Sequence, residues 1–520
     1  MGNVISNVSH SQYDLGGGAR GGIDPSVGDW KLPAGNYVST GMGMTIVHPR
    51  PEIETNTWAR YRHEHTGVPY TIPVAVQGGA YPFHYELITF PSGMTIGEDL
   101  VASGDALTRP VDYGIINWAS PTAGSHTVKV RVTDQLNSIK EVEWTLTVGT
   151  AGWIFVNPLA ADDTGTGAID DPFKTVGRIH SDSASSTEFA GYRVYLRGGT
   201  IPLDGMATNG GNFRLDPNTN PLVWLGYPSE TVVVEEYEGW MVIGTGTDDV
   251  YLGGFTFQYA AAYSPGGGTA PIYMINSIGG YDRMQVHGLT FKEFKGSPFN
   301  AGAGNTAAMY FNSNPRNYIS ITGCEATGTV GIFVDCYQWN YSVIDGFNVH
   351  DAAIITTDGS AHTAFFIKDN PDFVTLRNIE MWDNNTWNSS IGGVGYMCQN
   401  GGTNTEVSYC TVLNPITSGR NGAVYLFNNN IDGGLVENLW LYRNSLNQRL
   451  VWEGSAMTNF ADGEEIHTKN ILQTQSIAVA DAKVTDIDNI DSGTYLDASM
   501  KLTGASKVSY LGTHGAEVAG

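Results

Sequence analysis

A short alternating pattern of apolar and polar positions recurs along the second half of the chain. It begins with Gly or Asn and continues apolar, polar, apolar; only Tyr409 breaks the leading position. The copies are GFTF (254–257), GLTF (288–291), GCEA (323–326), GFNV (346–349), NIEM (378–381), YCTV (409–412) and NLWL (438–441). Period-two alternation predicts β-strands with both apolar residues on one face, and the leading Gly or Asn suits a left-handed turn. We name this predicted element strand A.

A second predicted element, strand B, reads apolar, apolar, polar and keeps a fixed phase with strand A. Its copies are MIN (274–276), YFN (310–312), FVD (333–335), FIK (366–368), MCQ (397–399) and LFN (426–428). The step from B to the next A is 11 to 13 residues, whereas the step from A to B varies between 11 and 23. The chain from B to A thus has a nearly constant length, and the chain from A to B has a variable one. Such a pair of constant and variable connections, called arcs below, favours a coil of stacked walls over a sandwich or barrel.

The repeat therefore predicts an all-β fold, a parallel β-helix. We expect strands A and B to form two walls joined by a constant turn, and the A-to-B arc to carry the third wall and inserted loops. Insertions on one side of a solenoid commonly mark its binding face. Cys324 and Cys410 fall on inward positions of strand A and Cys398 on the core side of strand B, where cysteine acts as a small buried hydrophobe.

The N-terminal part of the chain follows different patterns. Residues 1–65 are rich in Gly and predict a flexible arm or attachment segment, and 66–149 alternate as in a β-sandwich, for example in TVKVRV (127–132). The run GGAYPFHYEL, then FPSGMTI, then GIINWASPTAGSHTVKVRVTD resembles bacterial and viral immunoglobulin- or cadherin-like modules. This resemblance, over about 85 residues, implies an Ig-like spacer or adhesion unit.

The segment GWIFVNPLAADDTGTGAIDDPFKTVGRIH (152–180) predicts a strand, a Gly/Asp loop and a short helix opened by Asp171-Pro172. Phe173, Val176 and Ile179 would share one face of that helix, which would cap the stack. Together with GYRVYLRGGT (191–200), the segment resembles the opening of the pectate-lyase-like β-helix superfamily. The resemblance implies a right-handed, pectin-lyase-like parallel β-helix over 150–474. Residues 475–520 would form short terminal rungs or a cap.

Charge excludes several classes of partner. The formal net charge is −25, with only 27 Lys plus Arg in 520 residues. A nucleic-acid backbone or an anionic membrane surface would be repelled, so we expect neither as a partner. The first twenty residues contain no apolar run typical of a secretory signal, and no stretch is long enough to span a membrane. No cysteine spacing predicts a metal site, and no cofactor motif is present.

No known catalytic set of the β-helix superfamily is complete in this chain. Of the NTD, DD, GHG and RIK motifs, only DD occurs, and no GxSxG or HExxH is present. Glycoside hydrolysis needs two carboxyl groups about 5 to 10 Å apart. Glu325 and Glu380 occupy the outward slot of strand A two rungs apart, and Asp351 and Asp383 come just after strand A, two residues beyond its end. The same residues also fit solvated positions and turn positions.

Aromatic residues on the looped side are candidates for holding sugar rings. WDNNTWN (382–388) combines two Trp with Asn and Asp, and Trp440 is placed in the outward slot of strand A by the NLWL copy. The predicted carbohydrate-binding residues are Trp382, Trp387, Trp440, Tyr442, Arg443 and His350.

The resemblance suggests a bacteriophage virion surface protein of the tailspike, fibre or head-decoration type. Such a protein implies a homotrimer on the virion surface, attached to other virion proteins through its N-terminal region and bound to bacterial surface polysaccharide. Two alternatives stay open: a polysaccharide depolymerase, either glycoside hydrolase or lyase, and a purely structural decoration protein.

Overall fold

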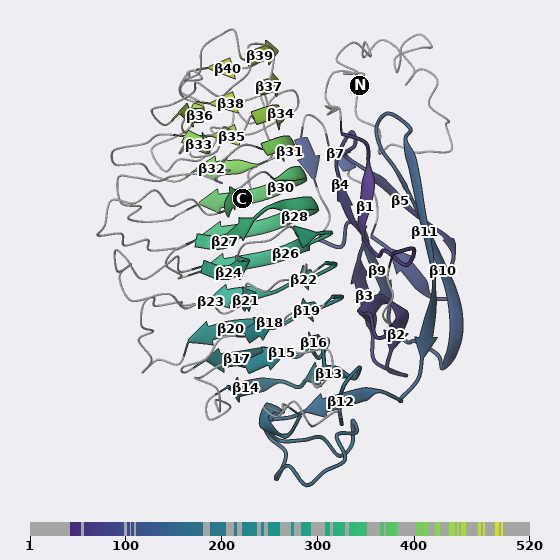
Figure 1. The fold of residues 1–520 in the computed structure, drawn as a ribbon. Helices are drawn as coiled ribbons and strands as arrows, with labels where there is room; N and C mark the ends of the chain where they lie inside the picture. Colours follow the sequence, from purple (N-terminus) through teal and green to yellow (C-terminus); the bar gives the residue numbers. More distant parts are fainter. Residues whose placement is uncertain are drawn as a thin grey trace.

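The computed structural model contains a parallel β-helix and an N-terminal, mostly antiparallel unit (Figure 1). The residues that it describes are 42–53, 57–97, 101–103, 106–108, 111–179, 188–203, 213–215, 221–236, 241–243, 248–259, 272–274, 282–292, 307–311, 316–327, 332–350, 365–368, 371–382, 402–408, 410–413, 422–426, 436–442, 445–446, 449–453, 466–469, 472–473, 484–487 and 490–491. The two units are called the β-helix and the antiparallel unit below.

The β-helix has three walls of parallel strands. Wall B consists of β15 (Phe213–Leu215), β18 (Met241–Ile243), β21 (Ile272–Met274), β24 (Ala307–Phe311), β27 (Ile332–Tyr337) and β29 (Phe365–Lys368). The strands β33 (Gly422–Leu426) and β36 (Arg449–Glu453) pair with each other as a separate two-stranded sheet. The predicted parallel β-helix is thereby confirmed, since successive copies pair in register at each rung.

Walls A and C belong to one large sheet that bends between them. Wall C contains β12 (Trp153–Val156), β13 (Arg193–Leu196), β16 (Val223–Gly226), β19 (Tyr251–Gly253), β22 (Gln285–His287), β31 (Gly402–Ser408), β34 (Val436–Tyr442), β37 (Ile466–Lys469) and β39 (Val484–Ile487). The short strand β25 (Arg316–Asn317) belongs to the same sheet and directly precedes wall C. Wall A contains β14 (Gly199–Pro202), β17 (Val232–Glu236), β20 (Thr256–Tyr259), β23 (Thr290–Lys292), β32 (Thr411–Leu413), β35 (Ser445–Leu446), β38 (Leu472–Gln473) and β40 (Ile490–Asp491). Three strands run through both walls: β26 (Ser320–Thr327), β28 (Trp339–His350) and β30 (Asp372–Trp382).

The position of the third wall differs from the expectation. Wall C lies in the constant B-to-A arc, where β22 precedes β23, and not in the variable A-to-B arc. The arc is constant because it holds a hydrogen-bonded strand between two corners, which leaves no room for insertions. The fixed spacing was itself the sign of a third strand.

Alternating side chains fill the inside of the coil. Phe257 stacks on Phe291 one rung above, with ring centroids 5.9 Å apart, and both are fully buried. Cys324 and Cys410 are buried as predicted, and Cys336 also points into the core beside Phe311 and Ile367. Burial raises the pKa of Cys324 and Cys410 to about 12, so these thiols stay protonated.

The corner between walls C and A uses left-handed residues, as the leading Gly or Asn predicted. Positive φ angles occur at Gly254, Gly288, Gly323, Gly346 and Asn378. The corner before wall C has its own left-handed series, which the sequence pattern did not reveal because non-glycine residues fill it. That series is Asp249, Arg283, Tyr318, Tyr341, Phe373 and Asn404.

The predicted capping helix at Asp171-Pro172 is wrong. Phe173 instead forms a parallel bridge with Val156, and only Val176–Arg178 form a short 3-10 turn (η4). Asp163 accepts the backbone N–H groups of Lys174 and Thr175 at 2.8 and 2.7 Å, which holds the segment extended up to that turn. Phe173, Val176 and Ile179 are nevertheless buried against the core, so the apolar positions were identified correctly.

The antiparallel unit begins before residue 66. Its sheets, in hydrogen-bonding order, are β1 (Thr45–His48) with β4 (Ala75–Gln77); β2 (His63–Glu64), β11 (Ile139–Val148), β10 (Gly124–Thr133) and β5 (His84–Thr89); β3 (Tyr70–Pro73), β9 (Ile115–Trp118) and β6 (Met94–Ile96); and β7 (Val101–Ser103) with β8 (Ala106–Thr108). A 3-10 turn, η3, covers Arg60–Arg62. Residues 45–48 and 63–64, which the composition assigned to the arm, are therefore strands of this unit.

The antiparallel unit packs along the outer face of wall C (Figure 1). One hydrophobic cluster joins Val76, Tyr81 and Trp144 of the antiparallel unit to Tyr195 and Tyr251 of wall C. Arg377 of wall C donates to the Val76 carbonyl oxygen at 2.7 Å, and the Gly78 N–H donates to Thr375 Oγ1 at 3.2 Å. A spacer would extend away from the coil. The antiparallel unit instead packs against it, which differs from the expected spacer.

Candidate functional site

The outer face of wall A carries two parallel rows of polar side chains. Because side chains alternate along a strand, the buried residues of wall A leave their neighbours pointing outward. One row runs through Thr256, Thr290, Glu325, Asn348 and Glu380, which pair directly from rung to rung. The second row, two residues further along each strand, runs through Glu235, Gln258, Lys292, Thr327 and His350.

Glu325 lies at the centre of this face. Its Oε1 is 2.7 Å from His350 Nε2 on the next rung, and its Oε2 accepts from Thr290 Oγ1 at 3.4 Å on the rung before. The Glu325 side chain is 43% exposed and that of His350 is 18% exposed. The carboxylate is therefore held from both neighbouring rungs and remains open to solvent.

Glu380 lies two rungs from Glu325, with Asn348 between them, as the strand A spacing predicted. At ~4.8 Å per rung, the two backbones are roughly 10 Å apart. Glu380 and Glu325 are both half-buried, whereas Asn348 is exposed. The face thus presents two carboxylates, an amide and an imidazole within three consecutive rungs.

Several predicted site residues lie outside the described part of the chain. They are Asp351, Asp383, Trp387 and Arg443. Trp382 ends β30, and its backbone pairs with His350, so it continues the second row of wall A.

The predicted place of Trp440 and Tyr442 is wrong. Both lie in β34 of wall C, where Trp440 pairs with Glu406 and Tyr442 with Ser408. The wall A strand of that rung is β35, since Ser445 pairs with Thr411. The NLWL copy matches the apolar pattern of strand A, but wall C strands alternate in the same way, so the pattern could not tell them apart.

Lys292, Thr290 and Asn348 belong to the outer face but were not among the predicted site residues. They occupy the same slots as the identified residues in neighbouring copies of strand A. Aligning the copies and reading every polar column would have found them, because the copies are in register.

A second group of ionisable residues is buried between the antiparallel unit and wall C. Glu64 accepts hydrogen bonds from Arg60 at 2.6 Å and from the Tyr195 hydroxyl at 2.9 Å. Burial raises the pKa of Glu64 to about 7, against the opposing charge of Arg60. Further along wall C, Arg377 pairs with Asp345 at 3.0 Å, and Arg377 is fully buried. The Tyr195–Glu64 hydrogen bond and the hydrogen bond from Arg377 to the Val76 carbonyl tie the two units together.

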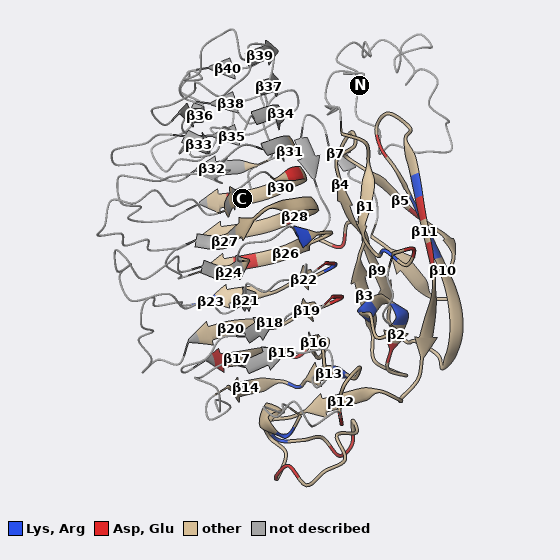
Figure 2. Cartoon of the chain, in the orientation of Figure 1, with Lys and Arg blue, Asp and Glu red and all other residues tan. Residues whose placement is uncertain are grey.

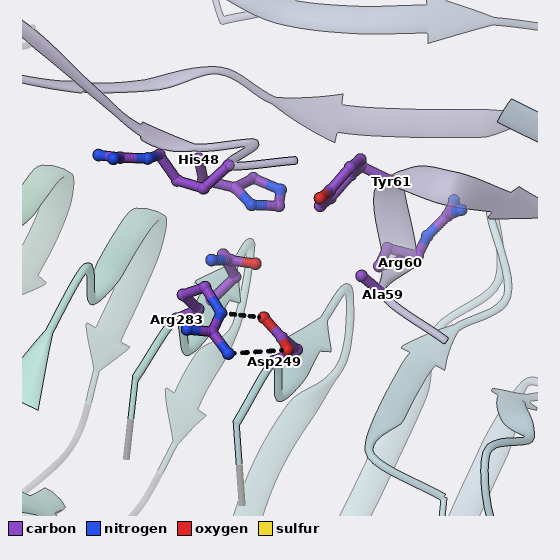
Figure 3. Close-up of a pocket in the computed structure, with 8 residues that line it drawn as sticks. His48, Ala59, Arg60, Tyr61, Asp249 and Arg283 are labelled. Atoms are coloured by element: carbon purple, nitrogen blue, oxygen red, sulfur yellow. Dashed lines mark hydrogen bonds and ion pairs between the residues drawn. The ribbon is translucent and has the colours of Figure 1, made fainter. Parts of the chain in front are cut away.

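A small cavity lies in the same interface (Figure 3). His48, Arg50 and Arg60 of the antiparallel unit face Gln285 and the Asp249–Arg283 ion pair of wall C across it, and it has room for about one water molecule. Burial lowers the pKa of His48 to about 3, and the positive charge of Arg60 contributes to the shift. The cavity is too small for a sugar, so we assign it to the packing of the two units.

Among the described residues, no group of three or more His, Cys, Asp or Glu is arranged to hold a metal ion. No helix in that part of the chain has the length and apolar character needed to cross a membrane.

Comparison with known proteins gives distant matches only. No protein-family model and no curated protein matches the chain. Among solved structures, pectate lyase Pel9A is 14% identical, with 66% of this chain and 81% of that chain covered and a TM-score of 0.36. A rhamnogalacturonan lyase is 12% identical, with 70% and 99% covered and a TM-score of 0.37. The GH136 lacto-N-biosidase from Eubacterium ramulus is 9% identical, with 65% and 67% covered and a TM-score of 0.35. Similarities this remote identify no family and no shared site.

Proposed function

We propose that wall A binds polysaccharide of a bacterial surface, and that the protein is a virion surface protein of the tailspike, fibre or head-decoration type. The observation that carries the glycan proposal is the pair of polar rows on wall A. Each rung contributes one side chain to each row, so hydroxyl, carboxylate, amide and imidazole groups follow one another in register along the wall. An extended glycan offers hydroxyl groups at regular intervals, so it can hydrogen-bond to successive rungs.

The covering of wall C supports the choice of wall A. Tyr195, Val223 and Tyr251 of wall C are buried beneath the antiparallel unit. On wall A, the outward Lys292 and Asn348 are exposed and Glu325 is half-exposed. Figure 1 shows the antiparallel unit beside wall C, with the wall A strands further from it. Of walls A and C, wall A is therefore the one with polar groups available to a long ligand.

The remaining parts of the proposal concern assembly. We propose that the protein forms a homotrimer on the virion surface and attaches to other virion proteins through its N-terminal region. In this arrangement the packed antiparallel unit stays with the β-helix, and wall A faces the host. The resemblance of the chain to phage β-helix proteins motivates this part.

Binding to purified capsular polysaccharide and lipopolysaccharide from a panel of bacteria tests the function. With a polysaccharide that binds, Glu325→Ala and Asn348→Ala should each weaken binding about tenfold, since each removes a hydrogen-bonding group. Glu141→Ala, on the exposed antiparallel sheet, is the matched control and should bind normally. If no glycan binds, or if only the control variant loses affinity, the proposal fails. A particle map with wall A against the capsid shell would instead support a purely structural role.

The Trp382 and Trp387 candidates need a separate test. Replacing both by Ala should abolish binding if the WDNNTWN segment stacks on sugar rings. Unchanged affinity in this variant, together with weakened binding by Glu325→Ala, would restrict the site to the wall itself.

The second candidate function is depolymerisation of the bound polysaccharide. It is favoured by Glu325 and Glu380, whose two-rung spacing is near that of the carboxyl pair of an inverting glycosidase. Incubation with the bound polysaccharide should then release reducing ends, and Glu325→Gln and Glu380→Gln should each abolish the release. An absorbance of unsaturated uronate would indicate a lyase instead. If neither product forms from any bound polysaccharide, the enzymatic function is excluded.

A further inference from the structure

The charge of the wall A face favours one class of glycan. The outward positions of wall A between Glu235 and Glu380 contain three carboxylates and one ammonium group. The carboxylates are Glu235, Glu325 and Glu380, and the ammonium group is Lys292. His350 is held against Glu325 at 2.7 Å, so its imidazole is directed toward a protein carboxylate.

Among the described outward positions of this face, carboxylates therefore outnumber ammonium groups. The whole chain has a formal net charge of −25, and Figure 2 shows acidic residues on β17 and β26 of wall A. A polyanionic glycan laid along these rungs would bring its carboxylates close to Glu325 and Glu380. Two like charges at such close range repel, and the repulsion is stronger at a protein surface than in bulk water.

A carboxylate is, in contrast, a good partner for an uncharged sugar. It has only acceptor oxygens, and each sugar hydroxyl can donate to them; such charge-assisted hydrogen bonds are stronger than neutral ones. Glu325 contacts Thr290 at 3.4 Å and His350 at 2.7 Å, but its side chain is 43% exposed, which leaves acceptor capacity toward solvent. Asn348, the exposed residue between the two carboxylates, adds both donor and acceptor groups.

We infer that wall A selects glycans without negative charge, namely neutral sugars or amino sugars, over uronate-rich or otherwise acidic polysaccharides. This inference rests on the proposed glycan binding. It also gives the carboxylates a role in specificity that does not depend on catalysis. The selected face runs over five rung steps, about 24 Å at ~4.8 Å per rung, which is long enough for an oligosaccharide.

The test uses acidic surface polysaccharides, each in its native form and after chemical reduction of its uronate carboxyls to alcohols. Binding of both forms to the full-length protein is measured by calorimetry at low salt. The reduced form should bind at least about tenfold more tightly than the native form, because it lacks the repelled charges. In Glu325→Gln/Glu380→Gln, which keeps the shape of both side chains, the preference should fall below about threefold.

Lys292→Gln is the matched control, since it removes a positive charge from the same face. It should keep or increase the preference for the reduced form. Equal binding of both forms, or tighter binding of the native acid, would overturn the inference while leaving glycan binding intact. Absence of binding to both forms, and to neutral polysaccharides run in parallel, would overturn the proposed function together with the inference.

Discussion

Single residues at the corners determine whether the chain can turn from wall C into wall A. Gly254, Gly288 and Gly323 have φ angles of +74°, +61° and +58°, where a Cβ is unfavourable. Asn378 takes the same place at φ +53°, in agreement with the tolerance of Asn for this region. The leading Gly or Asn of strand A is therefore a backbone requirement and not a sign of ligand binding.

Gly288→Ala should destabilise the protein by about 1 to 2 kcal/mol, since Ala is strained at this φ angle while the nearest atom to the new Cβ is 4.0 Å away. Gly288→Asn should cost less. Gly149→Ala is the control, because Gly149 has no left-handed φ and no atom within 4 Å of the added Cβ. Urea unfolding followed by circular dichroism measures the differences. Equal stability of both Ala variants would contradict this reading of the corner.

His48 should make stability depend on pH. In the unfolded chain its imidazole takes up a proton near pH 6.5, but in the folded protein its pKa is about 3. The unfolded state therefore binds more protons below pH 6.5. The stability that the neutral His48 contributes is fully present above pH 6.5. It is lost as the pH falls toward 3, by up to about 1.4 kcal/mol per pH unit.

Urea unfolding at pH 7, 5.5 and 4.5 measures this slope. His48→Gln should have a shallower slope than the parent protein. His126→Gln, at a partly exposed site on β10, should retain the parental slope. A slope unchanged by His48→Gln would show that other groups account for acid sensitivity.

At the scale of elements, the sequence predicted walls A and B but misplaced wall C. The apolar alternation of strand A is strong because Phe257, Phe291 and Ala326 all pack inside the coil. Wall C is apolar on both faces in its early rungs, as in β13, where Val194 faces the core and Tyr195 faces the antiparallel unit. A strand buried on both sides loses its alternation, so its position could be found only from the structure.

The register of the strands also decided which residues of the candidate site could be placed from the sequence. Glu325 and Glu380 were correctly placed two rungs apart, since their copies have a clear register. Trp440 was misplaced because β34 of wall C matches the strand A pattern. The contact between Glu325 and His350 depends on side chains of adjacent rungs, which spacing alone does not specify.

The inward cysteines give a test of the element register. In native protein, Cys324, Cys336 and Cys410 should not react with a thiol reagent, because they are buried and burial keeps Cys324 and Cys410 protonated. In denaturant, all 4 cysteines of the chain should react. Mass spectrometry of labelled peptides identifies the reacting residues. Rapid native labelling of Cys324 or Cys410 would contradict the assigned inward face.

At the scale of the whole molecule, the antiparallel unit and the β-helix form one body through a buried polar interface. Arg377 connects them, since it pairs with Asp345 on wall C and donates to the Val76 carbonyl of the antiparallel unit. Its guanidinium also lies over the Tyr81 ring, 4.6 Å from the centroid. This interface covers wall C, whereas the outer face of wall A has exposed polar residues, so wall A is the proposed surface for a long ligand.

Arg377→Met should therefore destabilise the protein by about 3 to 5 kcal/mol, since it leaves Asp345 buried without its ion-pair partner. Arg131→Met is the matched control: Arg131 pairs with Glu141 at 2.8 Å on the surface, and its loss should cost at most about 1 kcal/mol. Thermal unfolding compares the two. A similar loss of stability in both variants would mean that the buried Arg377 contributes no more to folding than a surface ion pair.

The most direct measurement of the central claim is an experimental structure of the protein with a bound oligosaccharide prepared from a polysaccharide that it recognises. We expect sugar density along the outer face of wall A, with hydroxyl groups within hydrogen-bonding distance of Glu325 and Asn348. Density on wall B, on the antiparallel unit or at the ends of the coil, with the wall A rows unoccupied, would contradict it.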